Sequence, residues 1–122
     1  MATINSRRVL IIDDNVALAE NIAEILQMDG HDTEVAVSAE EALPKAERLE
    51  PDVVVADYRL PGLTGAAFIK QLKLGRLPVV GVIISAYTDD GTMREAREAG
   101  ASFLAKPLDF SLLSRMVREG TA

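Results

Sequence analysis

The chain has 122 residues, 48% of them hydrophobic, and a formal net charge of −6. This length fits one domain with a buried core, and the composition excludes a disordered or fibrous chain. The negative charge argues against direct binding of nucleic acid, whose phosphates require a basic patch. The absence of cysteine excludes disulfides and thiolate metal sites, and it fits a cytoplasmic location.

No segment predicts export or membrane insertion. The longest apolar run, Val79 to Ile84, is far too short to cross a bilayer. Residues Met1 to Arg8 lack the apolar stretch of a secretory signal. We therefore expect no membrane partner and a single domain over residues 1–122, with its core at about 7–119.

Short apolar runs alternate with segments of helical periodicity along the chain. The predicted strands cover residues 9–12, 33–37, 53–57, 79–85 and 102–105. The predicted helices cover residues 17–28, 38–49, 64–74, 88–99 and 109–117, with Ser38, Thr64 and Asp109 as N-caps. Such alternation predicts parallel strands joined by right-handed crossovers. The expected fold class is α/β, with a doubly wound (βα)5 five-stranded parallel sheet and helices on both faces.

A few residues carry local predictions of their own. Pro44 falls inside the second helix and removes a backbone donor, which predicts a kink or a broken first half. We expect His31, the single histidine, to be a surface turn residue. Met28, Met93 and Met116 stand at the spacing of helix core positions.

Chemically active side chains follow four of the five predicted strands. Asp13 and Asp14 follow the first strand, Asp57 ends the third, Ser85 ends the fourth and Lys106 follows the fifth. Because all strands of a doubly wound sheet end at one edge, we expect these groups to converge. Clustered carboxylates repel unless a cation is present, and Mg²⁺ prefers oxygen ligands. A carboxylate beside Mg²⁺ can accept a phosphoryl group, with a hydroxyl and an ammonium binding its oxygens.

These motifs, in this order, resemble those of the response-regulator receiver domain, the phosphoacceptor module of two-component signalling. The resemblance covers Arg8 to Glu119 and implies a flavodoxin-like fold. It rests on Ile11-Ile12-Asp13-Asp14-Asn15, Asp57-Tyr58-Arg59-Leu60-Pro61-Gly62 with Gly65, Ser85-Ala86, and Ala99-Gly100-Ala101 followed by Lys106-Pro107.

The resemblance implies a role for each acidic residue. Asp57 would be the phosphorylated residue. Asp14 and Asp57 would bind Mg²⁺ directly, with Mn²⁺ as the alternative. Asp13 would act mostly through water, and the backbone carbonyl of Arg59 would be a further ligand.

The resemblance also implies a switch. Ser85 would follow the phosphoryl group, Lys106 would pair with it, and the Lys106–Pro107 bond would be cis. Phe103 stands where the family has its switch aromatic, although it lacks the hydroxyl of the tyrosine often found there. The face of the fourth helix, fifth strand and fifth helix would then change shape.

The resemblance further implies partners. The phosphodonor would be a histidine kinase or a histidine phosphotransfer protein. The target would be a downstream protein or output domain, with a phosphorylation-dependent homodimer as a further option and no output domain in this chain. Arg59 and Tyr87 stand where family members tune water access to the phosphate, and their bulk predicts slow self-hydrolysis.

Two other functions compete with this one. A phosphatase of the haloacid-dehalogenase type also uses a strand-end aspartate, but it needs a second acid two residues later, where this chain has Arg59. The other alternative is a receiver-like interaction module that works without phosphorylation. The full set of clustered carboxylates argues against it, because unused clustered charge only destabilises a domain. We therefore expect a signalling switch that catalyses only its own phosphorylation and dephosphorylation.

Overall fold

The computed structural model describes residues 6–119, which form a five-stranded parallel sheet and five helices. The sheet strands are β1 (Arg8–Ile12), β2 (Asp32–Ala36), β3 (Val53–Asp57), β6 (Val80–Ser85) and β7 (Ala101–Ala105). The helices are α1 (Val16–Met28), α2 (Ala39–Leu49), α3 (Gly65–Leu74), α4 (Asp90–Glu98) and α5 (Phe110–Glu119). The strand order β2-β1-β3-β6-β7 confirms the predicted doubly wound sheet. No helix within these described residues is long and apolar enough to span a membrane.

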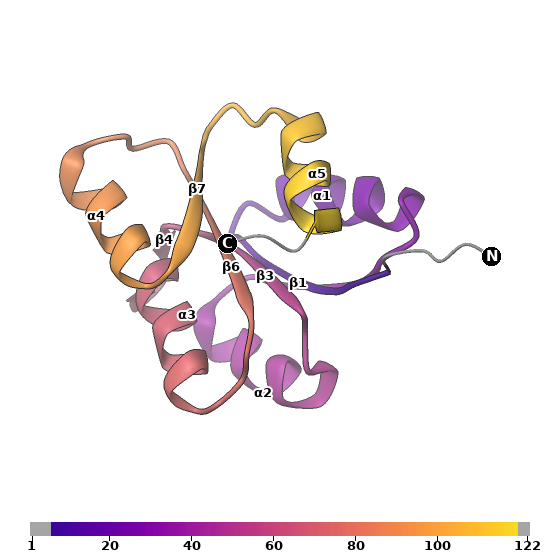
Figure 1. Ribbon diagram of the computed structural model, residues 1–122, viewed down its shortest axis with the longest axis horizontal. Helices are drawn as coiled ribbons and strands as arrows, with labels where there is room; N and C mark the ends of the chain where they lie inside the picture. The colour runs from indigo at the N-terminus through magenta and orange to yellow at the C-terminus, as the bar shows by residue number, and fades with distance from the viewer. Residues whose placement is uncertain (1–5, 120–122) are drawn as a thin grey trace.

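Helices cover both faces of the sheet. Figure 1 shows α1 and α5 on one face, and α2, α3 and α4 on the other. Every residue of the central strand β3 is buried, because its valines find apolar partners on both faces. Val53 and Val55 pack toward α1 and α5, whereas Val54 and Ala56 pack toward α2 and α3. This packing fixes the strand end that carries Asp57.

Three predicted helix caps are confirmed. Ser38, Thr64 and Asp109 each accept, at 3.1 Å, the backbone N–H of the residue three positions later. The Glu41 carboxylate also accepts a backbone N–H at 3.1 Å from the residue before the Ser38 cap. These bonds satisfy donors that a helix start leaves unpaired, so the strand-to-helix turns around the site have fixed geometry.

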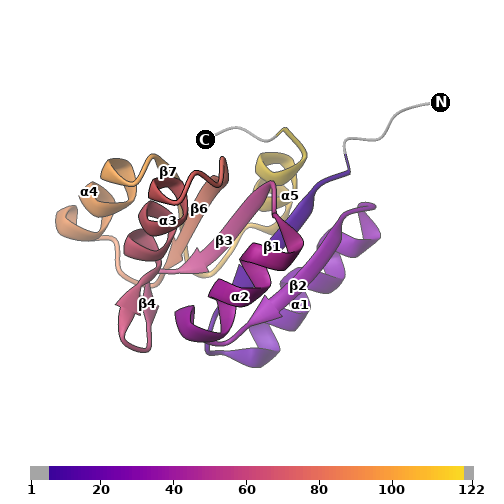
Figure 2. The same ribbon diagram turned by 90° about the horizontal axis from the view of Figure 1, so that it is seen from below.

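A small hairpin, which the sequence pattern did not predict, follows β3. Strand β4 (Arg59–Leu60) pairs antiparallel with β5 (Leu63–Thr64) across a Pro61-Gly62 turn. The φ of Gly62 is 79°, a left-handed value that glycine adopts without strain. Figure 2 shows the hairpin projecting past the end of β3.

Of the kink or broken first half expected in the second helix, the break is wrong, because α2 is one continuous helix through Pro44. Proline has no N–H to donate to the carbonyl of Glu40. Both residues are exposed, so water can bind that carbonyl. On the opposite side of the helix, Ala42 and Ala46 are fully buried and hold it against the sheet.

Two further local predictions are wrong. His31 is buried, with 5% of its surface exposed, and its Nδ1 accepts the backbone N–H of Arg7 at 2.9 Å. Met28 is 82% exposed and Met93 39% exposed, whereas Met116 packs against the cluster under α1 and α5. Helical spacing identifies a face of a helix, but only the packing shows whether another element covers that face.

Candidate functional site

Four strand ends bring polar side chains to one edge of the sheet. Asp57 is the last residue of β3, and Ser85 is the last residue of β6. Asp13 directly follows β1, and Lys106 directly follows β7. The backbone N–H of Lys106 donates to the Ser85 carbonyl at 2.8 Å, which ties the last two strand ends together.

The ammonium of Lys106 lies between two buried carboxylates. Its Nζ is 3.2 Å from Asp13 Oδ2 and 3.1 Å from Asp57 Oδ1. The exposed fraction is 1% for Asp13 and 8% for Asp57. The backbone N–H of Asn15 donates to the other oxygen of Asp13 at 2.9 Å. Lys106 therefore bridges the ends of the first and third strands by charge.

Burial raises the pKa of Asp57 above its ordinary value of 3.8. The negative charges of Asp13 and Asp14 add to this rise, while the hydrogen bond from Lys106 opposes it. For Lys106, burial lowers the pKa, but the hydrogen bonds and charges of Asp57 and Asp13 outweigh it, so the pKa lies above 10.5. The edge thus holds more negative charge than one lysine neutralises.

Asp14 adds a solvent-facing carboxylate to this pair. Asp13, Asp14 and Asp57 each offer one carboxylate oxygen, and these oxygens lie within 4.8 Å of one another. Asp14 is exposed, so the group opens to solvent. A donor set made only of oxygens suits a hard divalent cation such as Mg²⁺. These residues therefore fit the metal that the sequence resemblance implies.

Ser85 and Phe103 lie on the two neighbouring strands. Ser85 is 1% exposed, and its Oγ accepts the backbone N–H of Tyr87 at 2.8 Å. Phe103 pairs with Ile83 in the β6–β7 register and packs, partly buried, against the core cluster under α2, α3 and α4. The Lys106–Pro107 peptide bond is cis.

Two exposed side chains beside the site stack on each other. The guanidinium carbon of Arg59 is 4.4 Å from the ring centroid of Tyr87. Such an exposed cation–π contact contributes about 0.5–1 kcal/mol. Sequence position put both residues next to the site but could not reveal the stack, because it joins strand β4 to the loop after β6, which is distant in the chain.

Gly65 positions the strand that carries Asp57, a role that the sequence pattern did not assign. A Cβ atom at Gly65 would collide with the backbone oxygen of Asp57. The N–H of Gly65 donates to the carbonyl of Tyr58 at 2.8 Å. Helix α3 therefore starts in direct contact with the end of β3, an approach that only glycine permits.

Comparisons with known proteins agree with this architecture. Response regulator receiver protein Anae109_2439 of Anaeromyxobacter sp. (strain Fw109-5) is 35% identical over 103 residues, which are 84% of this chain and 43% of that protein. Sporulation initiation phosphotransferase F of Bacillus subtilis (strain 168) is 27% identical over 115 residues, 93% of each chain. The chain thus spans less than half of the first relative and nearly all of the second.

Solved structures and a family model give the same result. The receiver domain of Francisella response regulator 1452 superposes with a TM-score of 0.86 at 28% identity, covering 94% of this chain and 96% of that one. The family model described as response regulator receiver domain matches residues 9–118. Since that match covers nearly all of the described residues, the chain belongs to the response regulator receiver domain family of two-component signalling.

Proposed function

We propose that this chain accepts a phosphoryl group on Asp57 within a two-component or phosphorelay system. The observation that carries the proposal is the nearly buried Asp57 carboxylate, 3.1 Å from the Lys106 ammonium and grouped with Asp13 and Asp14. A carboxylate so placed can form an acyl phosphate, and the neighbouring cation can take up the added negative charge.

Asp13, Asp14 and Asp57 are the side chains that would hold Mg²⁺, or Mn²⁺, with the backbone carbonyl of Arg59 as a further ligand. The buried position of Asp13 and its bond to Lys106 fit a role mostly through water. When bound, the ion neutralises charge on the transferred phosphoryl group.

In the transfer step, a carboxylate oxygen of Asp57 would form the bond to phosphorus. The bond from phosphorus to the imidazole nitrogen of a phosphohistidine would break, and its electron pair would stay on that imidazole. Lys106 would move from the two carboxylates to a phosphoryl oxygen, pairing with the charge that arrives. The donor would be a histidine kinase or a histidine phosphotransfer protein.

Movement of Ser85 would carry the change at Asp57 to the surface of the domain. Its hydroxyl now accepts the N–H of Tyr87 at 2.8 Å, so turning it toward a phosphoryl oxygen would release the loop that leads into α4. Phe103 would then turn inward, and the face of α4, β7 and α5 would rearrange. That face would act on a downstream protein, an output domain or a second copy of the chain.

We propose a signalling switch and not a phosphatase acting on other substrates. Arg59, two residues after Asp57, is exposed and stacked on Tyr87, so it offers no acid to a leaving group. Residues 1–122 would form one receiver unit, of which 1–5 and 120–122 lie outside the described residues. A cytoplasmic location stays a prediction, based on the absence of cysteine.

Incubation with acetyl phosphate and Mg²⁺, followed by intact mass measurement, tests the proposal. We expect a stoichiometric gain of about 80 Da, the mass of one phosphoryl group. Asp57→Asn should abolish it, and the surface control Asp32→Asn should retain it. Sustained turnover of the phosphodonor would favour the phosphatase, and no adduct would favour an interaction module that works without phosphorylation.

A further inference from the structure

Helix α4 is anchored by few buried side chains. Of its nine residues, Thr92 and Ala96 are buried. Helix α3 buries five of its ten residues, among them Phe68 and Ile69. Figure 1 shows α4 at the edge of the molecule, where it packs beside β7. Apolar packing holds α3 in place, whereas the position of α4 depends more on polar contacts.

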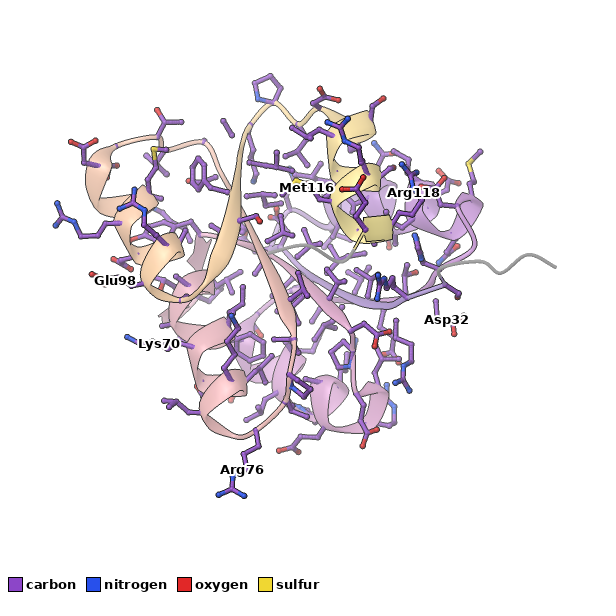
Figure 3. The ribbon with its side chains drawn as sticks, viewed as in Figure 1. Asp32, Lys70, Arg76, Glu98, Met116 and Arg118 are labelled. Atoms are coloured by element: carbon purple, nitrogen blue, oxygen red, sulfur yellow. The ribbon has the colours of Figure 1, made fainter. Side chains whose placement is uncertain are left out.

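The seam between α3 and α4 is open. A shallow cavity of about 250 Å³ lies between the two helices. Its lining combines small alanines with charged side chains: Ala66, Ala67, Lys70, Glu95, Glu98 and Ala99. Figure 3 shows Lys70 and Glu98 on the same side of the molecule, pointing outward into solvent. Because no large apolar side chain lines this cavity, little packing at the outer side of the α3–α4 boundary resists a shift of α4 along α3.

Polar contacts hold α4 at two places. Beyond its C-terminal end, Lys73 of α3 donates to the carbonyls of Ala99 and Gly100 at 2.9 and 3.2 Å, a favourable position for a cation at a helix C-terminus. One turn before that end, the Tyr58 hydroxyl donates to Glu95 Oε1 at 2.8 Å. Lys73 ties α4 to its neighbouring helix, whereas Tyr58 ties it to the site.

Tyr58, next to Asp57, is held in place by backbone hydrogen bonds and by packing of its ring. Its N–H donates to the Ile84 carbonyl and its own carbonyl accepts the N–H of Gly65, both at 2.8 Å. Its ring packs, partly buried, against the core cluster under α2, α3 and α4.

We propose that the hydrogen bond from Tyr58 to Glu95 is a latch that holds α4 in the arrangement of the unphosphorylated domain. The proposal rests on the function proposed above, in which Asp57 accepts a phosphoryl group and α4 moves. Tyr58 directly follows Asp57 and precedes the proposed metal ligand Arg59. A change of backbone position at the site would therefore move Tyr58, whose hydroxyl bonds to α4. The strength of the latch then sets how readily the domain changes state.

The side chains allow a test with matched variants. Tyr58→Phe removes the hydroxyl and keeps the ring in the core. Glu95→Ala removes the acceptor, whereas Glu95→Gln keeps an acceptor oxygen at the same place. Glu98→Ala is the control, since it removes the same charge from the same helix one turn later, where Figure 3 shows the side chain in solvent.

The first measurement is amide hydrogen exchange of residues 90–98 in metal-free protein. We expect Tyr58→Phe and Glu95→Ala to speed exchange about two- to tenfold, the range for loss of one ordinary hydrogen bond. Glu95→Gln and Glu98→Ala should exchange like the wild type. Because the two broken variants remove the same bond, the double variant should add nothing further.

The second measurement is the affinity for beryllofluoride with Mg²⁺, a mimic of the acyl phosphate. Breaking a latch that opposes the rearranged state should tighten binding about two- to tenfold in Tyr58→Phe and Glu95→Ala, with Glu95→Gln near the wild type. Unchanged or weaker binding in the broken variants would overturn the latch alone. A wild-type protein that binds no beryllofluoride would overturn the proposed function, and the latch with it.

Discussion

The two edges of the sheet both bury titratable side chains, and they do so in opposite ways. At the carboxyl edge, Asp13 and Asp57 are buried as charged groups around Lys106. At the amino edge, His31 is buried as a ring whose Nδ1 accepts the backbone N–H of Arg7. Charge is kept at the edge proposed for chemistry, while the other edge uses a neutral hydrogen-bond acceptor.

The pKa directions express the same difference. Burial raises the pKa of Asp57 and lowers the pKa of His31. For His31, the Asp29 charge opposes this fall, while the charges of Arg7 and Arg118 add to it. Within residues 6–119, His31 Nε2 and Arg7 Nε are buried without a hydrogen-bond partner. Asp57 at one edge and His31 at the other should therefore change the folding stability with pH in opposite directions.

The largest effect is expected from Gly65→Ala at the carboxyl edge. The added Cβ meets the backbone oxygen of Asp57, which cannot move without disturbing β3. We expect a loss of about 3 kcal/mol in the free energy of unfolding, measured by urea denaturation. Gly75→Ala at the other end of α3 is the control, since its new Cβ would make ordinary contacts at 3.5 and 3.6 Å. Equal losses in both variants would show that the close approach is not what matters.

Asp57→Asn should stabilise the domain at neutral pH by roughly 1 kcal/mol. The folded pKa of Asp57 lies above 3.8, so the folded state binds a proton more readily than the unfolded chain. The ionised carboxylate therefore costs stability above its folded pKa, and this cost disappears as pH falls toward 3.8. Lys106 keeps its contact with Asp13 in the variant. We would measure the free energy of unfolding of the wild type and of Asp57→Asn by denaturation, at neutral pH and near pH 3.8. The two free energies should become equal at the lower pH. A difference that persists there argues that burial of the charge is not the cause.

His31 should make the amino edge sensitive to acid in the opposite direction. Its folded pKa lies below 6.5, so the unfolded chain binds the proton more readily and stability is lost as pH falls below 6.5. We expect a loss below about 1 kcal/mol between pH 7 and pH 5.5, reduced in His31→Asn, whose side-chain oxygen can still accept from Arg7. Thermal unfolding at both pH values measures this change. An equal loss in both proteins would place the acid sensitivity elsewhere.

The smallest effect is expected from Arg59→Ala, which removes the stack on Tyr87. If Asp57 is phosphorylated as proposed, the phosphoryl group becomes more open to water. We expect self-hydrolysis to accelerate about two- to fivefold, the rate equivalent of an exposed cation–π contact. Decay of the phosphorylated mass measures the rate, with the solvent-exposed Arg76→Ala, labelled in Figure 3, as control. An unchanged decay rate would mean that the stack does not shield the phosphate.

Local signals explain why much of the fold and site could be predicted from the sequence. The caps at Ser38, Thr64 and Asp109 depend on neighbours within one turn. The grouping of Asp13, Asp14 and Asp57 depends only on where each strand ends, because parallel topology carries all strand ends to one edge. The continuity of α2 through Pro44 and the burial of His31 were mispredicted, since both depend on packing against other elements.

The sequence by itself determined the order of the five sheet strands and five helices, the capped starts of three helices and the acidic residues at the strand ends. Those features follow from short-range periodicity and capping, which the chain encodes within a few residues. Only the tertiary structure decided that Lys106 bridges Asp13 and Asp57, that Arg59 stacks on Tyr87 and that Tyr58 holds Glu95. Each of these contacts joins side chains far apart in the chain, and its geometry exists only after the helices have packed on the sheet.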